Sequence, residues 1–299
     1  MDNFNVSKVT ICRRENCPVN KGGPCLDDIE YVEDCQFAIT TESIKKEEFL
    51  TIPQGIGLSL VQADALLKKR KINTVSMIGA IGSGKTTFLA VLFHRFFRDY
   101  NGFNNHYFMD TETILGLNRK LHFAVLKSGN SSVQMPRTSS HEEPVFHFKT
   151  KDHNGKINEN FWFDIPGDSM EPLSKGIAGW ERFSALKNST HVMLFLDLSV
   201  ISNPQERGPH VQQALDVLAN SIQAKIWNGR KLLVVFSKSD KYLDNSRENI
   251  KKIKINIEDR FLSDFEKIEY CELHSLAKKI NDDDAVRNSL IEVWDWVYA

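Results

Sequence analysis

The chain has 299 residues, enough for one large or two modest domains with a full hydrophobic core. It contains 38 Lys and Arg against 39 Asp and Glu, so no overall charge attracts it to nucleic acid or to a membrane surface. The sequence has no run of about 18 apolar residues, and its first residues lack the apolar segment of a signal peptide. We therefore expect a soluble, cytoplasmic protein, and no partnership with nucleic acid or membrane is evident.

Residues 1–40 form a Cys-rich N-terminal segment, because four of the five cysteines lie there: Cys12, Cys17, Cys25 and Cys35. Four close thiolates in a reducing compartment could bind zinc tetrahedrally and stabilise a segment with little apolar content. The spacing lacks the paired C-x2-C knuckles of the commonest zinc sites. Two interpretations stay open, a zinc-stabilised docking element or a disordered leader with reduced thiols.

Residues 41–71 are expected to connect this segment to the main domain. They are predicted to begin irregularly and to end in a short helix, because apolar residues recur at roughly helical spacing. These residues are Leu58, Leu60, Ala63, Leu66 and Leu67.

Residues 72–299 are predicted to form a nucleotide-binding domain. From Ile72 to Phe93 the chain reads as an apolar strand, a glycine-rich turn and a helix, which is the setting of a phosphate-binding loop. The turn matches G-x-x-x-x-G-K-[ST], and the candidate phosphate-binding residues are Gly79, Gly82, Ser83, Gly84, Lys85, Thr86 and Thr87.

Each part of this loop has an expected role. Small residues let backbone amides surround phosphate oxygens, and the N-terminus of the next helix directs its positive dipole at the anion. Lys85 is expected to reach the β- and γ-phosphates, and the Thr86 hydroxyl is expected to bind Mg²⁺.

Two helices and a hairpin are predicted next. The helices cover Thr86 to Tyr100, with apolar residues on more than one side, and Thr111 to Lys127. An alternating run from Pro144 to Lys149 and a more continuously apolar run from Asn160 to Ile165 predict a hairpin whose second strand is central.

The end of that second strand carries D-x-x-G. Asp164 is placed to hold Mg²⁺, and the Gly167 amide is placed to sense the γ-phosphate.

The remainder alternates strand and helix, which predicts an α/β fold with a doubly wound, mostly parallel sheet and one antiparallel hairpin strand. The predicted elements are a strand at Thr190 to Leu198, a helix at Val211 to Trp227, a strand at Lys231 to Ser237, a helix at Asn249 to Phe265, a strand at Ile268 to His274 and a helix at Ala285 to Tyr298. Cys271 is predicted to be a core residue of the last strand. In such sheets the ligands bind at the carboxyl ends of the strands, where the motif residues lie.

The third strand of this series leads into Ser237-Lys238-Ser239-Asp240, which resembles the N/T/S-K-x-D base-recognition motif of Ras-like GTPases. Asp240 can accept hydrogen bonds from guanine N1–H and the exocyclic amine, whereas adenine would leave the carboxylate unpaired. Lys238 is expected to lie along the base.

Two further assignments come from this resemblance. Thr138 lies in a polar loop where a Ras-like GTPase carries the Thr that closes over Mg²⁺. Ser275 and Leu276 lie where such proteins contact guanine O6 through backbone amides.

From about Ile72 to Ala299 the chain resembles the translation-factor-related P-loop GTPases, and most of all the bacterial double-GTPase (type 2) family of conflict and defence systems. The narrower likeness rests on TETILGLNRKLHFAVLKSGN, MPRTSS, PVFHFK, FWFDIPGD and THVMLFLDLS. It implies a GTP- and Mg²⁺-dependent switch that hydrolyses GTP and serves, with protein partners, in an antiviral system.

Two residues depart from the Ras-like pattern. Asp168 stands where a water-orienting Gln would follow the D-x-x-G glycine, and Ile81 stands where the loop often has Gly. We therefore expect slow intrinsic hydrolysis, with the missing charge stabilisation supplied by a partner or by Arg137 beside Thr138.

Two other functions remain open on the sequence alone. One is a module that holds a guanine nucleotide without hydrolysing it and acts by assembly. The other is an ATP-dependent P-loop protein in which the SKSD sequence is accidental.

Overall fold

The computed structural model describes residues 7–43, 55–98, 102–124, 145–241, 247–274 and 284–298. The chain divides into two compact units, Met1–Ile52 and Pro53–Ala299. The division falls within residues 41–71, the expected connecting segment.

The smaller unit is built on a two-stranded sheet. Strand β1 (Ser7–Cys12) pairs antiparallel with β2 (Ala38–Ser43), and short 3-10 turns at Pro18–Lys21 and Val32–Asp34 lie between them. These two strands were not predicted, because the cysteines are the dominant signal in the sequence of this segment.

The larger unit contains a seven-stranded sheet in the order β4-β5-β6-β3-β7-β8-β9. Its strands are β3 (Asn73–Gly79), β4 (His106–Asp110), β5 (Val145–Asp152), β6 (Ile157–Asp164), β7 (His191–Asp197), β8 (Lys231–Ser237) and β9 (Lys267–Leu273). Strand β5 runs antiparallel to both of its neighbours, and the other six strands share one direction. The predicted α/β fold, with one antiparallel strand in a mostly parallel sheet, is confirmed.

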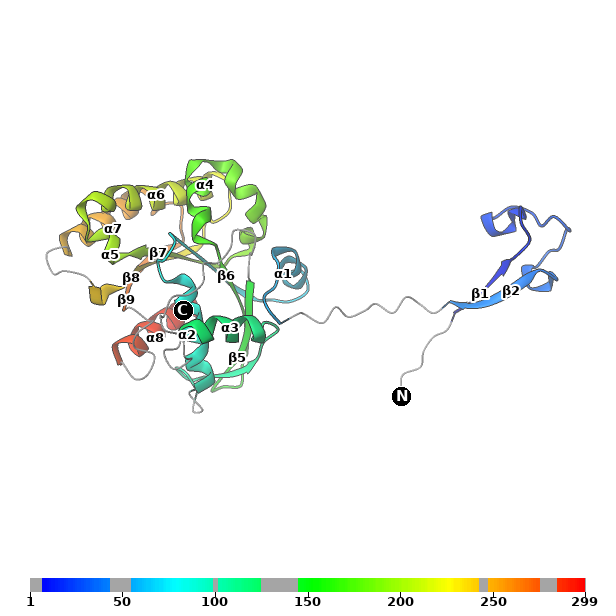
Figure 1. The fold of residues 1–299 in the computed structure, drawn as a ribbon, viewed down its shortest axis with the longest axis horizontal. Helices are drawn as coiled ribbons and strands as arrows, with labels where there is room; N and C mark the ends of the chain where they lie inside the picture. The colour runs from blue at the N-terminus through cyan, green and yellow to red at the C-terminus, as the bar shows by residue number, and fades with distance from the viewer. Residues whose placement is uncertain are drawn as a thin grey trace. The chain divides into compact units, whose positions relative to one another are not determined.

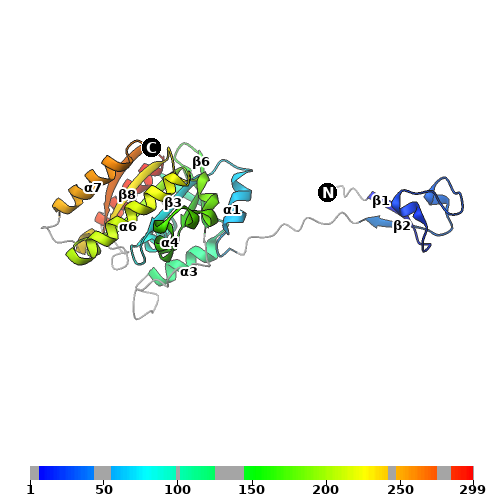
Figure 2. The ribbon, with the colours of Figure 1, turned by 90° about the horizontal axis from the view of Figure 1, so that it is seen from above.

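Helices cover both faces of this sheet. They are α1 (Leu60–Leu67), α2 (Lys85–Arg98), α3 (Ile114–Ala124), α4 (Met170–Lys175), α5 (Leu198–Ile201), α6 (Pro204–Gln223), α7 (Arg247–Phe261) and α8 (Asp284–Tyr298), with 3-10 segments at Gly167–Ser169, Ile177–Asn188 and Ser239–Lys241. Figures 1 and 2 show α4, α6 and α7 on one side of the sheet, and Figure 1 shows α2, α3 and α8 on the other. The unit is therefore a three-layer sandwich.

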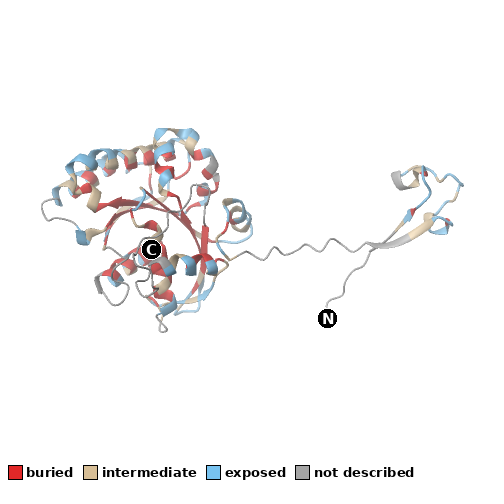
Figure 3. Cartoon of the chain, in the orientation of Figure 1, coloured by how far each residue is buried: buried red, intermediate tan, exposed pale blue. Residues whose placement is uncertain are grey.

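The central strands are buried on both faces, which explains their continuously apolar sequences. In β7, Val192 and Leu194 join the core beneath α6, whereas Met193 and Phe195 join the core beneath α2. Successive side chains of a strand point to opposite faces, so one apolar run supplies both cores. Figure 3 shows the buried residues concentrated on the sheet and on the inward sides of the helices.

The predicted hairpin is present, and its second strand is central as expected. Its turn is closed by Asp152 Oδ1, which accepts the backbone amides of Asn154 and Lys156, both at 2.9 Å. Strand β6 lies between β5 and β3. Strand β4 was not predicted, because its alternating residues lie at the sheet edge and are mostly exposed.

Several predicted helix boundaries differ from the structure, and the starts of α6 and α3 are two of them. Helix α6 begins at Pro204 and not at Val211, because the Asn203 side chain caps its N-terminus by accepting the Gln205 amide at 3.1 Å. Its first two turns carry few apolar residues, so periodicity could not reveal them. Helix α3 begins at Ile114, three residues later than the predicted start at Thr111.

Candidate functional site

The glycine-rich turn after β3 has the backbone conformation of an anion-binding loop. Gly82 and Gly84 have φ angles of +77° and +97°, which L side chains rarely adopt. At Gly79 a Cβ would lie 2.7 Å from the Phe195 carbonyl oxygen and 2.8 Å from Ser83 Oγ, so only glycine fits against β7. The loop therefore needs its glycines for two reasons, conformation and close packing.

Lys85 begins α2 and is 5% exposed. Its Nζ donates to the carbonyl oxygens of Gly79 at 2.7 Å and Ala80 at 3.2 Å. Burial lowers the Lys85 pKa to about 8, and the negative charges of Asp164 and Asp168 act in the opposite direction. The ammonium thus lies within the loop, where a bound anion would favour its charged form.

Two of the three predicted magnesium ligands, Thr86 at the start of α2 and Asp164 at the end of β6, are in contact. Thr86 Oγ1 donates to Asp164 Oδ2 at 2.8 Å, and the Asp164 side chain is 1% exposed. The other carboxylate oxygen, Oδ1, is buried and has no hydrogen-bond partner among the residues that the structure describes. A buried carboxylate oxygen without a partner beside a threonine hydroxyl fits a hard divalent cation, which prefers oxygen ligands.

Gly167 lies directly against the phosphate-binding loop. A Cβ on Gly167 would lie 2.6 Å from the backbone nitrogen of Ile81 and 2.7 Å from its Cα. The next residue, Asp168, is exposed, and Ile81 itself is 52% exposed. The D-x-x-G segment and the loop are therefore in backbone contact, with Ile81 at the open side of the loop.

The SKSD segment follows β8 and lies beside the same loop. A Cβ on Gly84 would be 4.0 Å from Ser237 Cβ. Lys238 has a φ of +58°, and its Nζ forms an ion pair with Asp197 Oδ2 at 2.5 Å. Asp240 lies in the exposed 3-10 turn that follows. The phosphate loop and the predicted base-recognition segment are thus neighbours at one edge of the sheet.

Four predicted site residues lie outside the described residues, namely Arg137, Thr138, Ser275 and Leu276. Thr87 is half-buried in the first turn of α2, next to Thr86. The predicted roles of all these residues stay predictions.

Two residues that sequence reasoning missed lie at the site. Asp197 ends β7, and its Oδ1 also accepts the Ser199 amide at 2.9 Å and the Ser199 hydroxyl at 2.6 Å. A carboxylate at the end of a buried strand was the signal that could have found it. Lys120 on α3 lies 3.5 Å from Asp164 Oδ2, and nothing in its local sequence indicated that contact.

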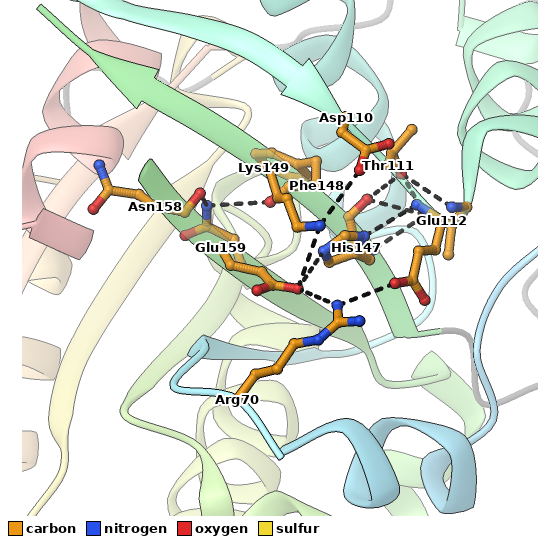
Figure 4. Close-up of polar contacts among 11 residues, drawn as sticks. Arg70, Asp110, Thr111, Glu112, His147, Phe148, Lys149, Asn158 and Glu159 are labelled. Atoms are coloured by element: carbon orange, nitrogen blue, oxygen red, sulfur yellow. Dashed lines mark hydrogen bonds and ion pairs between the residues drawn. The ribbon is translucent and has the colours of Figure 1, made fainter. Parts of the chain in front are cut away.

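A second polar cluster joins β5, β6 and the end of α1 (Figure 4). The buried His147 accepts the Glu112 amide on Nδ1 at 3.0 Å, and its Nε2 lies 3.1 Å from Glu159 Oε1. Arg70 bridges Glu159 at 3.0 Å and Glu112 at 3.3 Å. Burial lowers the His147 pKa, so the neutral ring donates from Nε2. Both ring nitrogens of His147 have hydrogen-bond partners, and the cluster has a structural role in joining these elements.

The four N-terminal cysteines lie together in the smaller unit. Cys12, Cys17 and Cys35 are buried, Cys25 packs against them, and none of the four forms a disulfide bond within the described residues. Backbone amides of Leu26 and Val19 donate to the Cys17 sulfur and lower its pKa. Within the described ranges no group of three or more His, Cys, Asp or Glu has an arrangement that could hold a metal ion. The expected zinc therefore stays a prediction. Cys271 is buried in β9, as predicted.

Comparison with known proteins gives one family match. The family model described as Double-GTPase 2 matches residues 73–295. No curated protein matches the sequence. No helix in the described part of the chain has the length and apolar character needed to cross a membrane.

The solved structures to which the chain is similar include two that share 12% sequence identity with it. One is the signal recognition particle receptor SRb-GTP/SRX complex from Chaetomium thermophilum, with a TM-score of 0.45 over 76% of this chain and 99% of that chain. The other is a bacterial selenocysteine-specific elongation factor, EF-Sec, with a TM-score of 0.39 over 76% of this chain and 29% of that one.

Proposed function

The chain belongs to the Double-GTPase 2 family, and from this premise we propose that it is a switch that binds GTP with Mg²⁺ and hydrolyses it slowly. The observation that best supports the proposal is the contact of Thr86 with Asp164, whose second carboxylate oxygen is buried and unpartnered beside the phosphate loop. These are the two side chains that a P-loop GTPase needs for Mg²⁺.

The proposed binding begins at the phosphates. Backbone amides from Gly82 to Lys85 surround the phosphate oxygens, and the Lys85 ammonium leaves its carbonyl partners for the β- and γ-phosphates. Thr86 and Asp164 hold Mg²⁺, which would neutralise charge that develops between the β- and γ-phosphates.

Guanine selectivity is proposed to rest on the end of β8. Asp240 accepts from guanine N1–H and the exocyclic amine, while Lys238 lies along the base with Asp197 holding its ammonium. Backbone amides at Ser275 and Leu276 are proposed to contact guanine O6.

Slow hydrolysis is proposed because the site offers poor groups for orienting water. A group that orients the attacking water must both donate and accept hydrogen bonds, whereas the ionised Asp168 carboxylate can only accept them. Asp168 also adds negative charge near a triphosphate. Ile81 presents an apolar side chain at the open side of the loop. We propose that Thr138 closes over Mg²⁺ and that Arg137 or a partner supplies a positive charge.

The first experiment is to identify the nucleotide that the purified protein carries, and then to displace a fluorescent GTP analogue with GTP or ATP. Displacement by GTP alone supports the proposal. Equal displacement by ATP would overturn the guanine assignment and favour the ATP-dependent alternative.

A second experiment separates a switch from a module that only holds nucleotide. Release of more than one phosphate per protein in multiple turnover supports a GTPase. The rate of single-turnover GTP hydrolysis by Arg137→Ala then tests whether Arg137 supplies the positive charge. An unchanged rate would remove Arg137 from the mechanism.

The wider role is proposed from family membership, as a cytoplasmic component of a bacterial multi-protein antiviral or conflict system. Protein partners would read the difference between the GTP and GDP states. The test compares phage resistance in cells that carry the protein with its neighbouring genes and in cells that carry its Lys85→Ala variant. Equal resistance would contradict a nucleotide-dependent defence role.

For the smaller unit we propose that the four cysteines bind structural zinc. The support is that three buried cysteines, with Cys25 packed against them, lie together in a unit with few apolar residues, which gains little stability from its own core. Metal analysis of protein never exposed to a chelator tests this, and less than about half an equivalent of zinc would contradict it. Cys12→Ser should lower the zinc content, whereas Cys271→Ser in the other unit should leave it unchanged.

A further inference from the structure

Lys120 on α3 is the basic side chain that lies against the proposed magnesium carboxylate. Its Nζ is 3.5 Å from Asp164 Oδ2 and 5.1 Å from the centre of the Phe146 ring, and its side chain is 17% exposed. A carboxylate and an aromatic face together hold an ammonium more firmly than either would alone. Lys120 is therefore fixed at the site and does not extend into solvent.

The same carboxylate oxygen already has a second partner. Thr86 Oγ1 donates to Asp164 Oδ2 at 2.8 Å. Asp164 thus joins the phosphate loop, through Thr86, to α3, through Lys120. Helix α3 also packs against α2, which begins at Lys85.

Lys85 and Lys120 each contact oxygen acceptors of the protein. Lys85 donates to two loop carbonyl oxygens, and Lys120 pairs with Asp164. A divalent cation at Asp164 would repel the Lys120 ammonium, because two positive centres would then share one carboxylate. A triphosphate held by the adjoining loop would offer the displaced ammonium a strong anion in place of Asp164.

We propose that Lys120 exchanges its partner when the site is loaded, leaving Asp164 to Mg²⁺ and contacting the terminal phosphate of bound GTP. This rests on the proposed function and adds to it a cation from α3, the helix that precedes the segment containing Thr138. GDP lacks that phosphate, so Lys120 would favour GTP over GDP and would link the position of α3 to the nucleotide state.

The test measures binding and does not depend on turnover. Affinities for GDP and for a non-hydrolysable GTP analogue are compared in wild type, Lys120→Gln and Lys120→Arg, each over a range of Mg²⁺ concentrations. In Lys120→Gln the preference for the GTP analogue should fall about tenfold, because a charge-assisted contact is lost. The Mg²⁺ concentration for half-maximal GDP binding should fall as well, since no ammonium competes for Asp164.

The controls separate this role from others. Lys120→Arg keeps the charge and should retain most of the preference for the GTP analogue. Arg119→Gln removes an exposed charge from the neighbouring position of α3 and should change neither quantity.

Two results would overturn the proposal: an unchanged preference and Mg²⁺ requirement in Lys120→Gln, or unfolding of that variant, which would make the ion pair a structural tie. Absence of guanine-nucleotide binding by the wild-type protein would instead defeat the proposed function itself.

Discussion

Asp164 is almost completely buried. Its role as a magnesium ligand was predicted, but its contact with Lys120 was not. Its place after an apolar strand, three residues before Gly167, was enough to predict a magnesium ligand. Its partner Thr86 came from the same motif reasoning, and the two side chains are in contact. Lys120 could not be predicted, because it is brought to Asp164 from a helix 44 positions earlier by the packing of α3.

Asp240→Asn should change the base preference of the site. The asparagine amide can donate where the carboxylate accepted, which suits xanthine, since xanthine has a carbonyl where guanine has its amine. We expect GTP affinity to fall by about 100-fold and the affinity for xanthosine triphosphate to rise, measured by competition with a fluorescent nucleotide. Lys241→Gln, in the same exposed 3-10 turn, is the control and should bind GTP like wild type. Unchanged GTP binding in Asp240→Asn would contradict base recognition by this residue.

Gly167→Ala should impair the response to the γ-phosphate. The added methyl group would meet the Ile81 backbone at 2.6 Å, so the segment must move away from the loop. Affinity for a non-hydrolysable GTP analogue should fall by about tenfold, while GDP affinity changes little, because the predicted contact of the Gly167 amide is with the γ-phosphate, which GDP lacks. Gly208→Ala, at a helical position with nothing within 4 Å, is the matched control and should leave both affinities unchanged. Equal losses for both nucleotides would argue against a γ-phosphate sensor.

At the scale of elements, the site is assembled from strand ends. Strands β3, β6, β7 and β8 finish at Gly79, Asp164, Asp197 and Ser237, and their register brings Met77 beside Asp164 and Asp197 beside Ser237. Parallel strands place their carboxyl ends at one edge, so motif residues far apart in sequence become neighbours. The alternation of strands and helices in the sequence predicted this arrangement of the motif residues at the strand ends. The edge strand β4 escaped prediction because half-exposed edge strands carry a weak apolar signal.

Helix α3 is held by the segment that enters the domain, which gives a test at this scale. The Gly116 amide donates to the Gly55 carbonyl at 2.8 Å, and a Cβ at Gly116 would overlap the Ile56 carbonyl oxygen at 1.4 Å. Gly116→Ala should therefore displace residues 55–58 and destabilise the domain by about 1–3 kcal/mol. Urea unfolding measures the change. Gly208→Ala should change the free energy of unfolding by less than about 0.5 kcal/mol, because the helix propensity of alanine is offset by the restriction that Pro209 places on the residue before it. If Gly116→Ala leaves the free energy of unfolding unchanged, residues 55–58 are not a fixed part of the domain.

At the scale of the whole molecule, buried histidines should make stability depend on pH. His191 begins β7, is 7% exposed and packs edge-on against Trp296. Burial lowers its pKa to about 4, and Lys231 on the neighbouring strand acts in the same direction. The unfolded chain binds the proton near pH 6.5, so this contribution to stability is complete above pH 6.5 and is lost as the pH falls towards 4.

His191→Phe should remove part of that dependence. The loss of unfolding free energy between pH 6.5 and 4 should shrink by about 2 kcal/mol, measured by urea unfolding at a series of pH values. His153→Phe alters an exposed turn residue and should leave the slope as in wild type. If the unfolding free energy of His191→Phe depends on pH as in wild type, the acid sensitivity arises from other groups.

The sequence by itself determined the fold class, the order of the elements and the chemistry of the loop. Those depend on local periods and on motifs in which neighbouring residues act together, as Gly79 to Thr86 do. Only the tertiary structure decided which distant side chains form ion pairs. These pairs are Lys120 with Asp164, Lys238 with Asp197, and Arg70 with Glu159. The physical reason is that such contacts arise where separate elements pack, and no local pattern in the chain encodes the distance between them.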